Sequence, residues 1–348
     1  MNTAPLDRST ATMQAIVRDR YGDTDHVLRP DTIERPAIAD HEVLVQVEAA
    51  GVDRGAWHLV TGLPYPIRLA GYGLRAPKNP VPGREVSGHV VDVGAAVTSV
   101  RVGDDVFGIA EGSFAQYARA RADRLAPKPQ RLDFTSAAAA TISAITALQA
   151  VRDHGRVHPG HRVLVIGASG GVGTFAVQIA KAHGADVTGV CSTSKIDLVR
   201  SIGADHVIDY TTDDITTEGV RYDVILDIAG NRPLRLLRRA LAPRGTLVIV
   251  GGENGGRWLG GSDRQLRALA LSPFVGQKLR TFIASENHDD LLVIAALIDS
   301  GKVTPVVERT FPLDETATAI RYLHDGHARG KVVITPPVAS ATSATLGT

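Results

Sequence analysis

Cysteine is almost absent from this sequence, and its scarcity excludes several kinds of protein. Cys191 is the single cysteine among 348 residues, so the chain has no internal disulfide and no cysteine cluster for zinc. The formal net charge is only +1, which gives no reason to expect nucleic acid or an anionic membrane surface as a partner. No apolar run reaches the roughly 18 residues of a membrane-spanning helix, and the first dozen residues lack an apolar secretory core. A cytoplasmic protein with no membrane or nucleic-acid partner is therefore predicted.

The composition is that of a globular protein, with 44% hydrophobic and 22% charged residues, and the length predicts about two domains. The first third of the chain contains short strand-like runs broken by Gly, Pro and Asp. These runs lie at 14–20, 42–51, 88–94 and 104–109. A helical stretch is expected at 134–155, with Thr135 or Ser136 as its N-cap. The N-terminal part is thus predicted to be β-rich, and its character changes near residue 134.

Beyond residue 160, strands and helices alternate along the chain. The expected strands lie at 163–166, 185–191, 205–210, 222–230 and 245–252, and the expected helices at 174–182, 195–203 and 233–243. Such alternation predicts a parallel sheet covered by helices on both faces. One more helix at 289–300 and strands at 307–313 and 331–335 complete the predicted order.

A glycine-rich turn between the strand 163–166 and the helix 174–182 carries the clearest functional signal. Gly167, Gly170 and Gly173 follow the strand at three-residue intervals. Strand, glycine turn and helix in this order begin a dinucleotide-binding βαβ unit, in which the backbone approaches a diphosphate at the helix N-terminus. The alternative is a tight turn with a purely structural role.

The end of the second strand indicates which nicotinamide cofactor is bound. NAD-specific domains usually place Asp or Glu there for the ribose hydroxyls. Here Ser192 and Lys195 follow the strand, and no carboxylate appears before Asp197. Hydroxyl and ammonium groups suit a 2′-phosphate, so NADPH is predicted. The alternative is that Ser194 caps the next helix and Lys195 is solvated.

This order of elements and the sequences of several segments resemble those of the medium-chain dehydrogenase/reductase superfamily. The resemblance is closer to its zinc-free quinone oxidoreductase branch, which includes zeta-crystallin. The resemblance extends over residues 13 to 336. Its marks are AAGVDRGAWHLVTG at 49–62, PVPGREVSGHVVDVG at 80–94, GDDVFG at 103–108, GASGGVGTFAVQIAK at 167–181, GADHVIDY at 203–210 and GKVVI at 330–334.

The resemblance implies an α/β fold with two domains. A β-rich, GroES-like catalytic domain is expected at 13–140, completed by 285–336, and a doubly wound Rossmann domain at 141–284. The active site is expected in the cleft between them. Residues 1–12 and 337–348 are expected to be flexible tails.

The residues at the family's zinc positions predict that no metal is bound. Asp53 stands where zinc members have a cysteine, and Arg84 and Glu85 stand where they have a His–Glu pair. Arg84 would repel a cation, and no His or Cys partner is in place. Without a Lewis acid, alcohol oxidation is disfavoured, whereas quinones and α,β-unsaturated carbonyls accept a hydride more readily. An ion pair between Asp53 and Arg84 is a plausible replacement for the metal.

Catalytic residues are expected in the loop 52–58, which in the family walls the nicotinamide pocket. Asp53 stands where zinc-free members often have Asn, and His58 where some have an active-site Tyr. His58 is a candidate proton donor, because histidine exchanges protons near neutral pH. The alternative is an ordinary loop histidine. Tyr65 and Tyr72 are further candidates, and they can equally be packing residues.

Further cofactor contacts are implied by the resemblance. They comprise the glycine turn, a helix residue near the nicotinamide, a tyrosine beside the 2′-phosphate, two turns at the carboxyl edge of the sheet and a lysine in a return strand. The residues are Ser169, Gly170, Gly171 and Val172; Thr146; Tyr210; Gly230, Asn231, Gly251 and Gly252; and Lys331. For the glycines, turn geometry alone is the alternative.

The family also commonly forms two-fold homodimers through its Rossmann domains. The apolar run 268–276 fits such an interface, and the alternative is that it packs on its own domain. Two other functions are weighed against a quinone or enone reductase. One is an NADP-dependent alcohol dehydrogenase or ketone reductase, and the other is a non-catalytic, crystallin-like relative.

Overall fold

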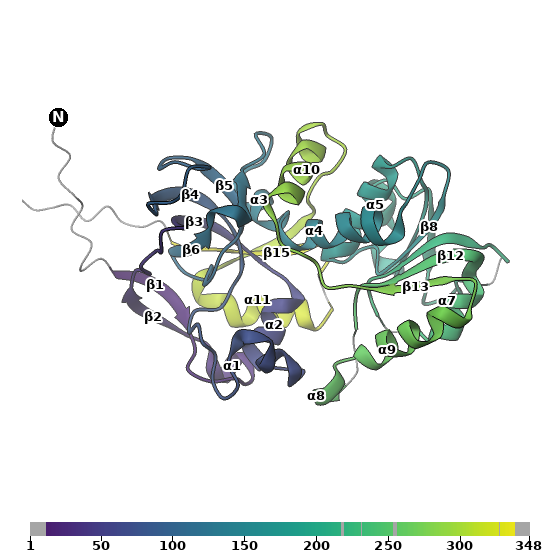
Figure 1. Ribbon diagram of the computed structural model, residues 1–348, viewed down its shortest axis with the longest axis horizontal. Coiled ribbons are helices and arrows are strands. Elements are labelled where there is room, and N and C mark those ends of the chain that lie inside the picture. Colours follow the sequence, from purple (N-terminus) through teal and green to yellow (C-terminus); the bar gives the residue numbers. More distant parts are fainter. Residues whose placement is uncertain (1–11, 217–218, 231, 253–255, 327, 338–348) are drawn as a thin grey trace, which may run out of the picture.

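The structure is a computed structural model that describes residues 12–216, 219–230, 232–252, 256–326 and 328–337. The predicted α/β fold, with a GroES-like and a Rossmann-type part, is confirmed: two large sheets lie at opposite ends of the long axis (Figure 1). Helices α3 (Phe134–Ala139), α4 (Ile142–Gln149) and α10 (His288–Asp299) lie between these ends. Apart from Thr12 and Pro337, the predicted flexible tails fall outside the described residues.

The seven-stranded sheet is built around β3 (Glu42–Val52), which pairs antiparallel with three other strands. Val43, Val45 and Val47 alternate into the core, as the period of a strand requires. Its strands, in spatial order, are β14 (Val307–Pro312), β15 (Lys331–Thr335), β3, β4 (Glu85–Val93), β5 (Asp105–Ile109) and β7 (Leu125–Pro127), with β6 (Tyr117–Arg121) also paired to β3. A separate hairpin joins β1 (Thr12–Val17) to β2 (Arg29–Glu34).

The second sheet is parallel throughout and has the order of a dinucleotide-binding fold. Its six strands are, in spatial order, β10 (His206–Asp209), β9 (Asp186–Cys191), β8 (Arg162–Ile166), β11 (Tyr222–Asp227), β12 (Leu241–Ile249) and β13 (Lys278–Thr281). The strand order reverses between β8 and β11, and ligands bind at the carboxyl edge of such a switch point. The assignment of each strand to one of the two sheets supports the domain boundaries near residues 140 and 285 that we propose.

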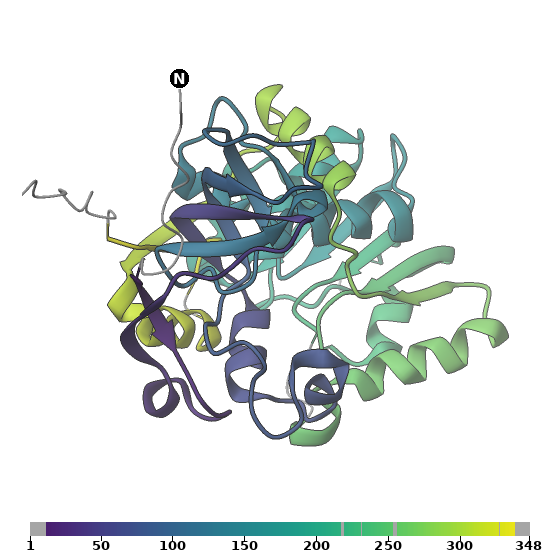
Figure 2. The same ribbon diagram turned by 60° about the vertical axis from the view of Figure 1, so that its left-hand side comes forward.

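The remaining described helices connect and cover the two sheets. They are α1 (Thr24–Val27), α2 (Arg54–Thr61), α5 (Gly171–Ala182), α6 (Ile196–Ser201), α7 (Leu234–Ala240), α8 (Gly256–Leu259), α9 (Ser262–Leu271) and α11 (Thr316–His324). Segment 54–72 lies beside α8 in both ribbon views (Figure 2). The Tyr65 amide donates to the Arg257 carbonyl there at 2.9 Å, so the two parts of the chain touch at this point.

The predicted single helix at 134–155 is instead broken into α3, α4 and the π-helical turn η3 (Ala150–Gly155). Thr141 interrupts it, with φ −102° and ψ −104°. The predicted N-cap at Thr135 or Ser136 is wrong, because the Asp133 carboxylate caps α3 by accepting from the Ser136 amide at 2.7 Å.

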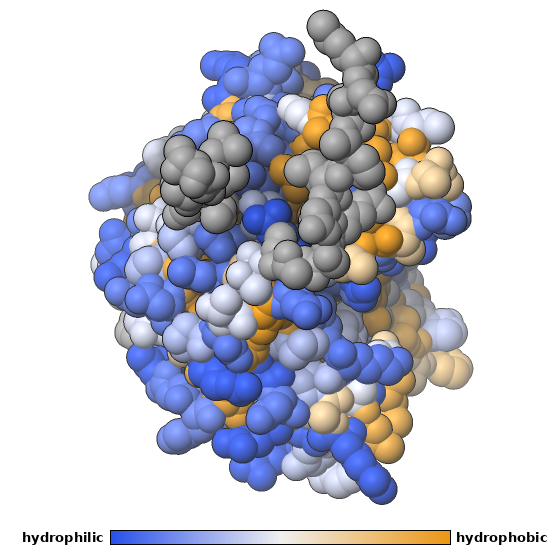
Figure 3. All heavy atoms as spheres, turned by 90° about the vertical axis from the view of Figure 1, so that its left-hand side faces the viewer, coloured by the Kyte–Doolittle hydropathy of each residue, from blue (hydrophilic) through white to orange (hydrophobic). Residues whose placement is uncertain are grey.

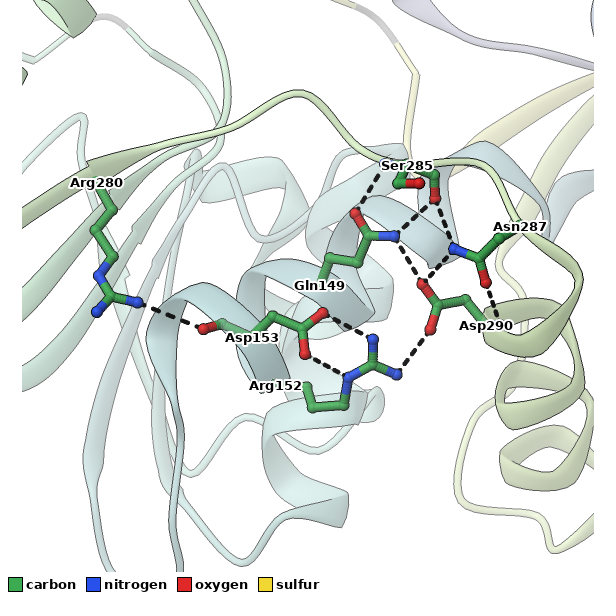
Figure 4. Close-up of polar contacts among 7 residues, drawn as sticks. All are labelled: Gln149, Arg152, Asp153, Arg280, Ser285, Asn287 and Asp290. Carbon is green, nitrogen blue, oxygen red and sulfur yellow. Dashed lines mark hydrogen bonds and ion pairs between the residues drawn. The ribbon is translucent and has the colours of Figure 1, made fainter.

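A polar network fixes the segment that leads out of the parallel sheet (Figure 4). The Gln149 amide group of α4 donates to the Ser285 carbonyl and to the Asp290 carboxylate, both at 2.7 Å. Arg152 also binds Asp290 at 2.7 Å, and the Asn287 side chain caps α10. The segment between Ser285 and Asn287 is therefore held at both ends, which positions Glu286 between them.

The largest part of the core extends from the parallel sheet to β5 and β7 of the other sheet. One large apolar cluster packs the parallel sheet against α4, α5 and α10, and another fills the sheet around β3. The face at the β1–β2 end mixes hydrophilic surface with scattered apolar patches (Figure 3). No helix in the described ranges is long and apolar enough to cross a bilayer.

Candidate active site

The glycine turn after β8 forms a cradle in which Gly167 and Gly173 could not be replaced by larger residues without strain or a clash. Gly167 has φ 85°, and a Cβ on Gly173 would lie 2.0 Å from the Gly167 carbonyl oxygen. A Cβ on Gly170 would meet only that same oxygen, at 3.5 Å, so space remains beside the backbone there. Helix α5 begins at Gly171 and presents its N-terminal amides to this space. The turn therefore fits a diphosphate group.

Lys331 reaches this turn from the other sheet and is almost fully buried. Its ammonium lies 2.5 Å from a Glu85 carboxylate oxygen and 3.2 Å from the Ser143 hydroxyl. A Cβ on Gly171 would lie 3.1 Å from the Lys331 side chain, and the Gly330 amide donates to the Ser169 carbonyl at 2.9 Å. The predicted Lys331, Ser169 and Gly171 are thus together, with the aliphatic part of Lys331 against the turn and its ammonium bound to Glu85 and Ser143.

Burial raises the pKa of the Glu85 carboxyl group above its ordinary value, and the positive charge of Lys331 opposes that change. The second oxygen of Glu85, Oε1, is buried without a hydrogen-bond partner among the described residues. Glu85 and Ser143 were not predicted as partners of Lys331. No local pattern in the sequence identifies this pairing, because Glu85 and Lys331 are 246 residues apart.

The residues predicted for the 2′-phosphate lie where β9 and β10 end, but Lys195 is not free in solution. Its ammonium donates to the Gly326 carbonyl at 3.2 Å and the Ala328 carbonyl at 3.0 Å. Burial lowers the pKa of Lys195, and Arg329 adds a second positive charge nearby that the sequence did not point to. Ser192 is half-buried, and Tyr210 is 55% exposed.

The alternative in which Ser194 caps the next helix is not what the structure shows. Lys195 occupies the N-cap position of α6 and makes no side-chain capping bond there. Ser194 is exposed and lies within the short turn η4 (Thr193–Lys195).

The turns after β11 and β12 meet closely at the carboxyl edge. Gly230 has φ 70°, and a Cβ there would lie 2.6 Å from the Gly251 backbone. Arg264 of α9 fixes this edge, because it binds the buried Asp227 carboxylate at 2.6 Å and reaches the Gly251 carbonyl at 3.4 Å. Gly252 follows on the same edge, and the predicted Asn231 lies outside the described residues.

Two further predicted cofactor residues lie on the helices beside the glycine turn. Thr146 is half-buried in α4, and its hydroxyl donates to the Ile142 carbonyl at 2.7 Å. Val172 is half-buried in the first turn of α5. The Thr146 hydroxyl donates its hydrogen within the helix, but its oxygen can still accept a hydrogen bond from a ligand.

The predicted ion pair between Asp53 and Arg84 is not formed. The segment 52–58 is not a loop: α2 starts at Arg54, and the Asp53 carboxylate caps it by accepting from the Ala56 amide at 2.9 Å. Arg84 instead binds Glu286 at 2.5 Å. Glu286, which sequence reasoning missed, also lies 3.5 Å from Arg124.

His58 has a defined orientation. Its Nδ1 lies 2.7 Å from the Leu63 carbonyl oxygen, so Nδ1 carries a hydrogen and Nε2 is left as the nitrogen that can exchange a proton. The neighbouring Trp57 ring lies edge-on to it and stacks on His324 at 4.2 Å. The contact with Leu63 therefore leaves Nε2 as the ring nitrogen of His58 that is available to a ligand.

The two candidate tyrosines line different cavities. Tyr72 lines a cavity of about 620 Å³ together with Leu59 and Arg84. Tyr65 lines a second cavity of about 500 Å³, and its ring contacts Trp258 edge-on at 5.1 Å. Tyr72, not Tyr65, therefore shares a cavity with the arginine at a family zinc position.

The two carboxylates at the family's zinc positions have other partners, since Asp53 caps a helix and Glu85 binds Lys331. Within the described part of the chain, no three His, Cys, Asp or Glu side chains are grouped so that they could hold a metal ion. The donor set therefore does not fit zinc, which prefers Cys and His ligands.

Comparisons with known proteins agree with this fold. Two families match the chain: the alcohol dehydrogenase GroES-like domain at residues 39–130, and zinc-binding dehydrogenase at residues 202–334. The mitochondrial NAD(P)H oxidoreductase RTN4IP1 of Mus musculus is 34% identical, over 94% of this chain and 90% of its own. The chloroplastic NADPH-dependent alkenal/one oxidoreductase of Arabidopsis thaliana is 33% identical, over 93% of this chain and 80% of its own. Among solved structures, the quinone oxidoreductase from Coxiella burnetii has a TM-score of 0.80 and 26% identity, over 93% of this chain and 99% of its own.

Proposed function

Because this chain belongs to the medium-chain dehydrogenase/reductase superfamily, in its quinone oxidoreductase branch, we propose that it reduces quinones or α,β-unsaturated carbonyl compounds with NADPH and without zinc. Membership makes it a nicotinamide-dependent oxidoreductase. The proposal that the reaction needs no zinc rests on one observation. Asp53, Arg84 and Glu85 at the family's zinc positions are engaged with a helix end, Glu286 and Lys331 respectively.

The cofactor would be held by groups from both sheets. The α5 amides and Lys331 would bind the diphosphate, and Ser192, Lys195 and Tyr210 would surround the 2′-phosphate. The turns at Gly230 and Gly251 would border the nicotinamide ribose. When bound, NADPH supplies the hydride, and the remaining chemistry is delivery of a proton to the reduced acceptor.

His58 is the proton donor in this proposal. Its Nδ1–H is held by the Leu63 carbonyl, so the proton leaves from Nε2. We place the acceptor in the cavity that Leu59, Tyr72 and Arg84 line, because Arg84 stands at one of the family's zinc positions. We place Asp53 as the residue that fixes the start of this helix, and Tyr65 as a packing residue.

We also propose a homodimer. β13 is an edge strand of the parallel sheet, and nearby Phe274 and Ile283 are 84% and 97% exposed. Within the run 268–276, Ala268 is buried in its own domain, so only part of the run is available to a partner. The cytoplasmic location stays a prediction; the two relatives above are named as mitochondrial and chloroplastic.

The function is tested by following NADPH oxidation with protein shown by elemental analysis to be metal-free. Quinones, enones, unconjugated ketones and the reverse reaction with alcohols would be compared, with and without a chelator. We expect turnover of conjugated acceptors that the chelator does not change. Bound zinc, with chelator-sensitive activity confined to simple ketones and alcohols, would instead support the dehydrogenase that the family description names. NADPH binding without turnover of any acceptor would support a non-catalytic relative.

A further inference from the structure

Arg18 is a buried cation without an anionic partner. It follows β1 and is only 5% exposed. One of its terminal nitrogens, Nη1, donates to the Leu59 carbonyl, and its Nε is buried with no hydrogen-bond partner among the described residues. The Tyr21 ring lies 5.7 Å from the guanidinium. No ion pair joins Arg18 to any carboxylate of the described chain, and burial lowers its pKa to about 10.

Such an arrangement is unfavourable unless an anion arrives. Buried charges in proteins are normally paired or fully hydrogen-bonded, because removal from water is costly. A carbonyl oxygen and an aromatic ring compensate only in part. The other arginines around the same cavity follow the rule, since Arg84 binds Glu286 and Arg119 binds Glu111. Arg18 therefore differs from its neighbours.

Arg18 lines the 620 Å³ cavity that we propose for the acceptor, whose size is typical of small-molecule sites. Leu59 and Tyr72 line it as well, and Arg84 stands at the family's zinc position. The Tyr21 hydroxyl holds this wall in place by donating to the Tyr72 and Gly73 carbonyls, at 3.0 and 2.7 Å. Basic groups outnumber carboxylates among the lining residues, so the cavity favours an anion.

We infer that this cavity binds an acceptor with an anionic tail, and that Arg18 receives the carboxylate at the end of that tail. The substrate class is a conjugated ketone whose alkene carries a chain ending in a carboxylate. The inference rests on the proposed function for the reacting end of the molecule, whereas the carboxylate site itself does not depend on turnover. A guanidinium is suited to this role, because its planar fork matches the two oxygens of a carboxylate.

The test compares conjugated methyl ketones bearing a terminal carboxylate with their methyl esters, at several chain lengths. At the best length, we expect the KM of the acid to be at least about tenfold below that of the ester, with similar kcat, since a charge-assisted contact readily supplies this ratio. Arg18→Met should remove the difference by raising the KM of the acid alone. Arg18→Lys should keep part of it, because the charge remains.

Arg119→Met is the matched control. Arg119 lines the same cavity, but it is already bound to Glu111 at 2.7 Å, so its loss should leave the ratio of acid to ester unchanged. Equal KM values for acid and ester at every length in the unchanged protein would overturn the inference. So would an equal loss for both compounds in Arg18→Met that has an unfolding temperature like that of the unchanged protein.

A binding measurement separates this inference from the proposed function. The saturated acid, which cannot accept a hydride, would be titrated by calorimetry into the protein in the presence of NADP⁺. Binding of the acid but not its ester, lost in Arg18→Met, supports the carboxylate site even if no acceptor is turned over. Turnover of neutral enones with no binding of the saturated acid would support the proposed function and refute the site. If Arg18→Met does not fold, the comparison of acid with ester in the unchanged protein decides.

Discussion

Replacement of Lys331 by methionine tests the buried ion pair that joins the two sheets. Lys331 and Glu85 are each about 1% exposed and lie 2.5 Å apart. Removing one member of such a pair strands the other charge in a medium that solvates it poorly. We expect Lys331→Met to lower the free energy of unfolding at pH 7 by about 3–5 kcal/mol.

The matched variant removes both charges. Glu85→Gln combined with Lys331→Met leaves neutral groups of similar size, and it should return the free energy of unfolding to within about 1 kcal/mol of the unchanged protein or above it. The exposed Lys302 provides a control, since Lys302→Met should change stability by less than about 0.5 kcal/mol. Urea unfolding followed by circular dichroism measures these four proteins and the single variant Glu85→Gln, which completes the double-mutant cycle.

The same variant predicts a pH dependence with a definite sign. The pKa of Glu85 is raised by burial in the folded state, and loss of the Lys331 charge raises it further. A proton therefore binds the folded form more tightly than the unfolded one. Relative to the unchanged protein, the cost of Lys331→Met should therefore be smallest below pH 4.5, the ordinary Glu pKa, and should grow as the pH rises through the folded pKa of Glu85.

Two results would refute this reasoning. One is a cost below about 1 kcal/mol for Lys331→Met at pH 7, which would mean that the pair is solvated. The other is a double variant as unstable as the sum of the single variants, which would mean that the two charges do not interact. NADPH affinity gives a separate readout of the proposed contact between Lys331 and the diphosphate: if that contact forms, the folded double variant should bind NADPH more weakly.

Three further predictions concern the cofactor, the proton and the assembly. Lys195→Ala should weaken NADPH binding at least about tenfold and leave NADH nearly unchanged in a fluorescence titration, and equal losses for both would refute the 2′-phosphate assignment. His58→Phe should lower kcat for enones by about 10²–10⁴-fold and affect quinones less at constant NADPH affinity, whereas an unchanged enone kcat would exclude it as donor. Light scattering should give about twice the 36.8 kDa chain mass, and Phe274→Asp should shift the protein toward monomer; a monomer at micromolar concentration in the unchanged protein would rule out the dimer.

Local sequence patterns identified five of the six strands of the parallel sheet, and the edge strand β13 was not predicted. The strand at 163–166, the glycine turn and the helix after it are each specified by neighbouring residues, and the structure places them within a few residues of the prediction. The helix at 134–155 shows the limit of such patterns. Its composition is helical throughout, but Thr141 has a backbone conformation outside the helical region, so the helix is interrupted at a site that helix propensity does not mark.

The candidate site was predictable only where its residues are close in sequence. Asp53 was expected to form an ion pair with Arg84. Its carboxylate instead caps the helix that starts at Arg54. Helix capping by Asp is a short-range interaction, and the segment was interpreted as a loop, so this competition was missed. The partners of Arg84 and Lys331 lie more than 200 residues away, and no pattern within either segment identifies them.

The order of strands in the sheet around β3 has a consequence for how the protein is made on the ribosome. β3 pairs with β15, the last strand of the described chain, whereas the parallel sheet is built from one continuous stretch. During synthesis the parallel sheet can therefore fold first, while the edge of β3 near Ala50 stays unpaired until residues 331–335 have been made. An unpaired strand edge is a site for association with other chains. A nascent chain paused before β15 would expose this edge, so the C-terminal strand protects the newly made protein from aggregation.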